Sequence, residues 1–179
     1  MEFTKLVKSS LGTDWLKLEG SKKLRFVSEF EGYQSLWDNE ASKGYRLPYD
    51  YALPDLPSTI RVSNKFVVFA IDKTEPSNMR LVKLEVGQAI INQLGDLVAD
   101  PDFGFTKYPP YDVKITRTGE GLKTKYAVMA LPDKSKITPK LLEGQDFDSK
   151  ALINSITKRG LEDFEEVKGN LAFAKTLES

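Results

Sequence analysis

Alternating apolar and polar residues predict five β-strands. Between residues 22 and 30, Leu24 and Phe26 alternate with Lys23 and Arg25, which is the period of a strand with one buried face. The same reasoning predicts strands over 61–72, 79–86, 111–118 and 122–129. A longer turn at 73–78 joins the second strand to the third, and Gly-Glu-Gly at 119–121 joins the last two as a hairpin.

A helix is predicted between the third and fourth of these strands. Apolar residues recur at helical spacing from Val86 to Val98, and Asp100-Pro101 ends the pattern. Three strands, a helix and two strands form the element order of the OB-fold, a five-stranded Greek-key barrel. We therefore expect a mainly β protein with some α-structure. A further helix is predicted from residue 149, with Asp148 or Ser149 as its N-cap.

Two segments fall outside the barrel pattern. Residues 31–58 contain three prolines and a high density of aromatic residues, and we expect an irregular insertion there. Its rings either form a small core that folds the insertion onto the domain or offer a contact surface. The predicted domains are residues 1–135, a barrel with this insertion, and residues 136–179, a helical and acidic segment. The second packs on the barrel or serves as a flexible partner-binding tail.

Composition excludes several chemistries. The 179 residues include no cysteine and no histidine, which excludes disulfides, thiol nucleophiles, Ser-His-Asp triads and most transition-metal sites. Lys plus Arg and Asp plus Glu both number 26, so the chain is not a globally basic binder. No apolar run approaches the roughly 20 residues of a membrane span. We expect a protein of the cytoplasm, that of a host cell if the protein is viral, with no cofactor or metal.

Basic residues gather locally despite this balance. Residues 59–83 and 103–130 each carry three more basic than acidic residues. Lys114 shares a strand face with Thr116, and Lys123 shares one with Lys125. A basic stripe beside aromatic rings suits single-stranded nucleic acid, because cations follow the phosphates while rings stack on unpaired bases. The alternative is an ordinary solvated sheet face.

Residues 100–126 resemble the replicative single-stranded-DNA-binding, or helix-destabilising, proteins of tailed phages. The similarity lies in Asp-Pro-Asp-Phe-Gly at 100–104, in the strand from Tyr111 to Thr118, and in the Gly-rich turn and strand up to Tyr126. A looser similarity extends over residues 13–130, with 31–58 lying where relatives carry an excursion between the first two strands. Some relatives bind zinc there through Cys and His, which this chain lacks.

The resemblance implies an OB-fold protein, not an enzyme, that coats single-stranded DNA in replication, recombination or repair. The DNA-binding residues are then expected to be Arg25, Tyr33, Trp37, Tyr45, Lys65, Phe66, Arg80, Lys114, Arg117, Lys123, Lys125 and Tyr126. Many relatives recruit replication proteins through a long acidic tail. Here the acidic cluster at 162–166 is short and internal, although the C-terminal segment is still the expected contact for such partners.

Two other functions compete with this hypothesis. The first is an OB-fold adaptor of a replisome or virion, in which the aromatic insertion contacts a protein. The second is a magnesium-dependent nuclease that gathers carboxylates, with Asp72, Asp100, Asp102 and Asp112 as the candidate ligands. Binding of oligonucleotides without degradation would distinguish the single-stranded-DNA-binding hypothesis from both of these alternatives.

Overall fold

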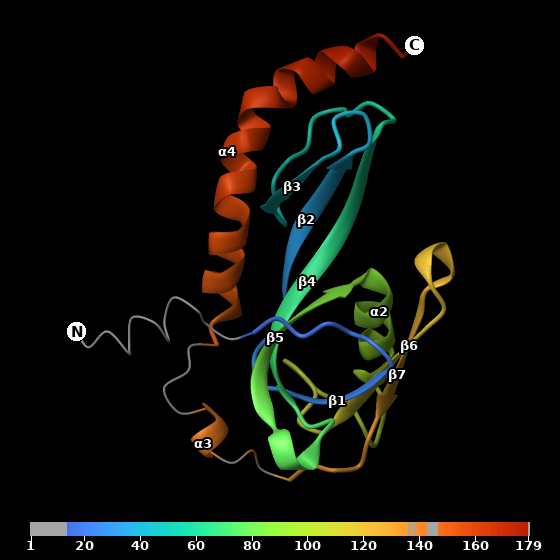
Figure 1. Cartoon of the computed structure of the whole chain (residues 1–179), viewed down its shortest axis with the longest axis vertical. Helices are drawn as coiled ribbons and strands as arrows, with labels where there is room; N and C mark the ends of the chain where they lie inside the picture. Colours follow the sequence, from blue (N-terminus) through green and yellow to red (C-terminus); the bar gives the residue numbers. More distant parts are fainter. Residues whose placement is uncertain (1–13, 136, 138, 143–146, 179) are drawn as a thin grey trace, which may run out of the picture. The chain divides into compact units, whose positions relative to one another are not determined.

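The computed structural model describes residues 14–135, 137, 139–142 and 147–178 (Figure 1). Its strands are β1 (Ser21–Phe26), β2 (Glu31–Asp38), β3 (Lys43–Pro48), β4 (Ile60–Asp72), β5 (Arg80–Gly87), β6 (Val113–Thr118) and β7 (Lys125–Ala130). Its α-helices are α2 (Gln88–Leu97), α3 (Pro139–Leu142) and α4 (Ser149–Thr176). Short 3-10 turns occupy Pro76–Asn78 and Gly121–Lys123.

The five predicted strands and the helix between them are confirmed as β1, β4, β5, α2, β6 and β7. The expectation of an irregular insertion over 31–58 is wrong for residues 31–48, which form the β2–β3 hairpin, whereas residues 49–58 contain no helix or strand. Tyr45 and Leu47 are buried while Arg46 between them is exposed, which is the alternation of a strand with one buried face. Pro48 ends β3, so the prolines follow the hairpin instead of interrupting it.

The chain divides into two compact units whose boundaries differ from the predicted ones. Unit 1 comprises residues 1–30 and 67–149, and unit 2 comprises residues 31–66 and 150–179. The predicted division at residue 135 separated the insertion from the C-terminal helix. In the structure both contribute to one core, since Leu36 and Tyr45 of the hairpin pack with Phe164 of α4. β4 contributes its first half to unit 2 and its second half to unit 1.

Unit 1 is built on antiparallel pairs in the order β5-β4-β1-β6-β7. These are the neighbours that a Greek-key barrel of five strands requires. The described strands form an open sheet, however, and β5 and β7 are not paired with each other. The fold is therefore mainly β with flanking helices, and the expected closed barrel is not confirmed.

Both free edges of this open sheet are occupied by other groups. At β5, Leu16 donates its N–H to the carbonyl of Lys83 at 2.8 Å, and the N–H of Lys83 donates to the backbone carbonyl of Asp14 at 2.8 Å. At β7, the Gln93 amide on α2 donates to the carbonyl of Tyr126 at 2.7 Å and accepts from the N–H of Val128 at 3.0 Å. These contacts satisfy backbone groups that an exposed edge would offer to another chain.

The core of unit 1 lies between the strands and α2. The helix turns Ile90 and Leu94 inward, and Leu24, Val113 and Ile115 are buried on the strands. Tyr111 is fully buried before β6. Its hydroxyl donates to the carbonyl of Phe103 at 2.5 Å, and burial raises the pKa of this phenol. Phe103 and Tyr111 also make an edge-to-face ring contact at 5.2 Å.

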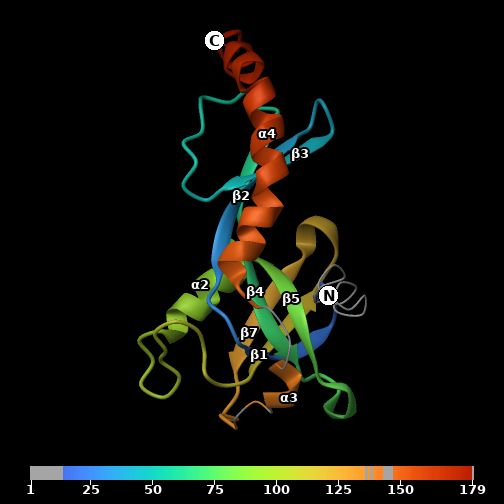
Figure 2. The same cartoon turned by 90° about the vertical axis from the view of Figure 1, so that its left-hand side faces the viewer.

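Unit 2 is a hairpin covered on one face by a long helix. Figures 1 and 2 show α4 running beside β2 and β3. The helix approaches closely at Gly160, where an added Cβ would lie 2.1 Å from the backbone oxygen of Arg46. Phe164 then reaches the rings of Tyr45 and Tyr51, with centroids 5.6 and 5.8 Å away. In the described part of the chain, no helix combines the length and hydrophobicity of a membrane span.

Candidate nucleic-acid interface

The outward face of β1, β6 and β7 is defined by the register of these strands. Lys23 lies opposite Lys114, and Lys114 lies opposite Met129. Two residues beyond Lys114 on β6, the hydroxyl of Thr116 is 2.9 Å from the hydroxyl of Ser21 on β1. Because directly opposed residues share a sheet face, Lys114 points away from the core on which Val113 and Ile115 are buried.

Three lysines follow the β6–β7 hairpin and are referred to below as the hairpin lysines: Lys114, Lys123 and Lys125. All three are exposed. No ion pair joins any of them to a carboxylate within the described residues. Their charge is therefore available to a phosphate without first breaking an internal pair.

The turn between β6 and β7 holds one of these lysines in a defined position. Gly119 has a φ of +77°, and a Cβ there would lie 2.2 Å from the carbonyl oxygen of Lys123. Gly121, with a φ of +55°, starts the 3-10 turn that contains Lys123. Only glycine takes these conformations readily. Leu122, between Gly121 and Lys123, is fully exposed, at 103%, so the turn presents an apolar side chain next to the cation.

Arg117 and Tyr126 do not join the hairpin lysines. They are direct cross-strand partners, and alternation places Arg117 on the face of Val113 and Ile115. Both are half-buried, and Nε of Arg117 is buried with no hydrogen-bond partner among the described residues. Arg117 and Tyr126, both expected among the DNA-binding residues, therefore lie on the other face of the hairpin from Lys114 and Lys125.

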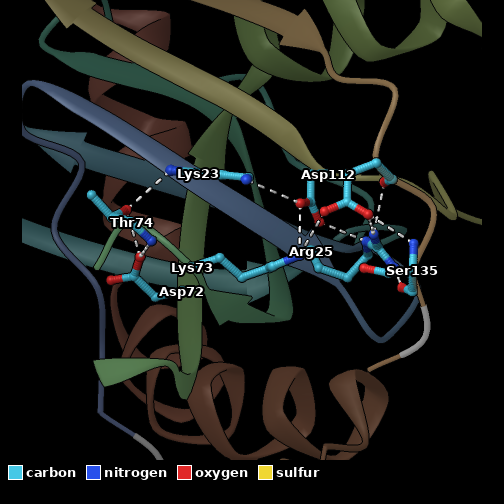
Figure 3. A network of polar contacts seen from close by, with 8 residues as sticks. Lys23, Arg25, Asp72, Lys73, Thr74, Asp112 and Ser135 are labelled. Atoms are coloured by element: carbon cyan, nitrogen blue, oxygen red, sulfur yellow. Dashed lines mark hydrogen bonds and ion pairs between the residues drawn. The ribbon is translucent and has the colours of Figure 1, made fainter. Parts of the chain in front are cut away.

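Arg25, an expected phosphate contact, is buried instead. Its side chain is 6% exposed and donates from Nε to Asp112 Oδ1 at 2.9 Å. Nη1 and Nη2 donate to the backbone carbonyls of Ser135 and Asp133 at 2.6 and 2.8 Å. Figure 3 shows this guanidinium pointing into the group of polar side chains around Asp112. The assignment of Arg25 to DNA binding is wrong, since all its nitrogens have protein partners.

Asp112 is the centre of this network. Its carboxylate has no solvent exposure and also contacts Nζ of Lys73 at 2.7 Å and Nζ of Lys23 at 3.6 Å (Figure 3). Lys73 lies 3.5 Å from the carboxylate of Asp133 as well. The N–H and hydroxyl of Ser135, followed by Lys73, hold the pKa of Asp133 well below its usual range. The cluster fastens the segment after β7 to β1.

The positions of these residues along the chain give little indication of the network. Arg25 and Asp112 are 87 residues apart, and either residue alone is typical of a solvated surface. The sequence analysis considered Asp112 as a candidate magnesium ligand. Two polar residues that flank buried positions on neighbouring strands, Arg25 beside Phe26 and Asp112 beside Val113, are the one feature that favoured a buried pair.

The aromatic candidates of the insertion separate into buried and exposed rings. Tyr33 and Tyr45 are 2% and 5% exposed, so their assignment as stacking residues is wrong. Burial raises the pKa of Tyr45. Trp37 is 44% exposed and remains a candidate. Phe66 is half-buried and contacts the ring of Tyr49, with centroids 6.0 Å apart.

Two cationic candidates lie elsewhere. Lys65 is half-buried near the middle of β4. Arg80 is exposed at the start of β5, with Nη1 3.7 Å from the carboxylate of Asp14. An exposed pair at that distance contributes little stability, so Asp14 does not prevent Arg80 from contacting another anion.

The carboxylates of the nuclease hypothesis have separate structural roles. Asp72 accepts from the N–H and hydroxyl of Thr74. Asp100 accepts from the N–H groups of Asp102 and Phe103, and Asp112 is surrounded by cations. Across residues 14–135 and the later described segments, no three acidic residues gather in a way that would hold a metal ion. These side chains therefore do not form the magnesium site that the nuclease hypothesis requires.

Comparisons with known proteins return no match: no family model, no curated protein and no solved structure corresponds to this chain.

Proposed function

We propose that this protein binds single-stranded DNA without sequence preference, through the hairpin lysines of unit 1. The proposal is supported by one observation above all: three exposed lysines follow one hairpin with no acidic partner among the described residues. Cations spaced along a strand pair can follow a flexible phosphate backbone. The sequence resemblance to phage single-stranded-DNA-binding proteins supports the same conclusion, and a role in replication, recombination or repair belongs to the proposal.

The turn of the hairpin adds a feature that suits unpaired bases. Leu122 is fully exposed beside Lys123, and Met129 is 58% exposed beside Lys114 in the register. Apolar side chains next to cations allow a base to be partly desolvated while its phosphate is neutralised. A duplex hides its bases in the stack, so this combination favours single strands over duplex.

We further propose that unit 1 is an open variant of the OB-fold. Its strand neighbours and the helix between β5 and β6 agree with that architecture. Residues 14–16 and Gln93 occupy the two edges whose pairing would close the barrel. OB-folds with positively charged grooves are a common means of binding single strands.

The test is the binding of fluorescently labelled oligo-dT, with unlabelled duplex and oligo-U as competitors. We expect binding that weakens with salt, weak competition by the duplex, and intact oligonucleotide after incubation with Mg²⁺. A protein that fails to bind oligo-dT at low salt would contradict the proposal and favour the adaptor hypothesis. Magnesium-dependent degradation would favour the nuclease hypothesis.

A further inference from the structure

The β2–β3 hairpin and the first half of β4 have one face that α4 does not cover. Leu36, Tyr45, Leu47 and Ile60 form the core that faces Phe164 of α4. Tyr51, Leu53 and Leu56, in the loop after β3, pack against the same core. Helix and loop therefore both lie on one side of these strands, and the side chains that alternate with the core residues point to the other side.

This α4-free face carries an exposed indole among cations. Trp37 alternates with Leu36, Arg46 lies between Tyr45 and Leu47, and Arg61 follows Ile60. Trp37, Arg46 and Arg61 are exposed, and Lys65 is half-buried two positions beyond Ser63 on the same face. Among the described residues, no carboxylate forms an ion pair with Arg46, Arg61 or Lys65. The acidic residue at an outward position of these strands is Glu31, at the other end of β2 from Trp37.

The Trp37 ring packs with one face against the backbone of β3. Trp37 lies opposite Gly44 in the register of β2 and β3. A Cβ at Gly44 would lie 3.5 Å from Cε3 of the indole, so the ring rests over a backbone that has no side chain. A large flat ring that is supported on one side and 44% exposed is suited to stacking on an unpaired base.

We propose that the α4-free face of unit 2 is a second contact surface for single-stranded nucleic acid, with Trp37 stacking on a base and Arg46 and Arg61 contacting phosphates. The inference rests on the proposed function and extends it to a unit that can be tested separately. Charge complementarity decides the occupant, because an exposed ring and three cations on one face attract a polyanion that also offers π-faces. A protein partner with an acidic surface is the alternative outcome of the test.

The experiment uses the full chain with Trp15→Phe, which leaves Trp37 as its one tryptophan. Phenylalanine keeps a ring at position 15, where the backbone pairs with β5. Labelled oligo-dT is titrated while the anisotropy of the label and the emission of Trp37 are recorded together. We expect the emission of Trp37 to fall in step with the rise in anisotropy.

Side-chain variants then measure each contact. Trp37→Ala is expected to weaken binding about 5- to 150-fold, the range for one lost stacked base. Arg46→Ala and Arg61→Ala are each expected to lower the slope of log affinity against log salt by about 0.7. Arg159→Ala is the matched control, since Arg159 is an exposed arginine on α4, and it should leave affinity and slope unchanged.

The outcomes separate the two proposals. A normal rise in anisotropy with constant Trp37 emission, and with unchanged affinity in the Trp37, Arg46 and Arg61 variants, would overturn this inference and leave the hairpin lysines as the binding site. If that result is accompanied by binding of an acidic polypeptide that Trp37→Ala abolishes, the face is a protein contact. No anisotropy change at low salt would overturn both proposals.

Discussion

Arg25 and Asp112 form a buried ion pair, with Nε of the arginine 2.9 Å from Oδ1 of the aspartate and both side chains almost without solvent exposure. The pair joins β1 to the residue that precedes β6. Lys73 and Lys23 add two further cations around the same carboxylate. Removing the aspartate would leave the buried cations of Arg25 and Lys73 without their common partner in a region of low dielectric constant.

Asp112→Ala is therefore expected to lower the free energy of unfolding by about 3–5 kcal/mol, the usual cost of breaking a buried pair. Denaturant unfolding followed by circular dichroism measures this change. Asp102→Ala is the matched control, because Asp102 is exposed and should change stability by no more than about 0.5 kcal/mol. Equal effects of the two substitutions would show that the network contributes nothing.

Two glycines of α4 give a test of how closely the helix packs on the hairpin. A Cβ at Gly160 would lie 2.1 Å from a backbone oxygen of Arg46, whereas a Cβ at Gly169 meets no atom within 4 Å. Gly160→Ala should destabilise the protein by about 1–3 kcal/mol through overpacking. Gly169→Ala should stabilise it by up to about 1 kcal/mol, because alanine favours the helix. Thermal unfolding of both variants measures the difference, and stabilisation by both would contradict the close contact.

Gln93 is expected to protect the edge of β7. Gln93→Ala removes two hydrogen bonds to the β7 backbone and should cost about 1–3 kcal/mol, since it leaves backbone groups unsatisfied. Gln93→Glu should be as harmful, because a carboxylate cannot donate to the carbonyl of Tyr126. Gln88→Ala, at an exposed position of the same helix, is the control. Chemical denaturation and light scattering report stability and edge-to-edge association, and normal values for both Gln93 variants would refute this role.

The pH dependence of stability should show the contribution of the ionised Asp133 carboxylate to the fold. Its pKa in the folded protein is below the ordinary value of 3.8, so it stabilises the fold above that value. This contribution is lost as the pH falls below about 4, when the proton binds more tightly to the unfolded chain. Asp133→Asn removes the titration but keeps an acceptor for Ser135. The loss of melting temperature between about pH 5 and pH 3 should then be smaller than in the wild type. Parallel curves would contradict the assignment.

Local patterns predicted most of the fold of unit 1. The alternation in 61–72 and 111–118 and the helical spacing after Val86 correspond to β4, β6 and α2. The β2–β3 hairpin was missed because prolines near its end were given more weight than the alternation of Tyr45 and Leu47. Sequence patterns also do not show which distant segments pack together, so the shared core of α4 and the hairpin could not be predicted.

Only part of the candidate interface could be predicted, because sequence patterns show local orientation but not long-range packing. Lys114, Lys123 and Lys125 are exposed as expected. Alternation along the strands decides the orientation of Lys114 and Lys125, whereas Lys123 lies in the 3-10 turn before β7. Arg25, Tyr33 and Tyr45 are buried, because their surroundings depend on residues far away in the chain. Arg46 and Arg61 were not selected from the sequence. Only the position of α4 shows which face of their strands remains open.

The proposal that the hairpin lysines bind single-stranded DNA is tested most directly by the salt dependence of oligo-dT binding. The wild type is compared with a triple variant that combines Lys114→Ala, Lys123→Ala and Lys125→Ala. If the hairpin lysines contact phosphates, each lost contact lowers the slope of log affinity against log salt by about 0.7, or about 2 for the three together. Lys134→Ala, an exposed lysine outside the hairpin, should keep the wild-type slope. Identical slopes for the wild type and the triple variant would contradict the proposed interface.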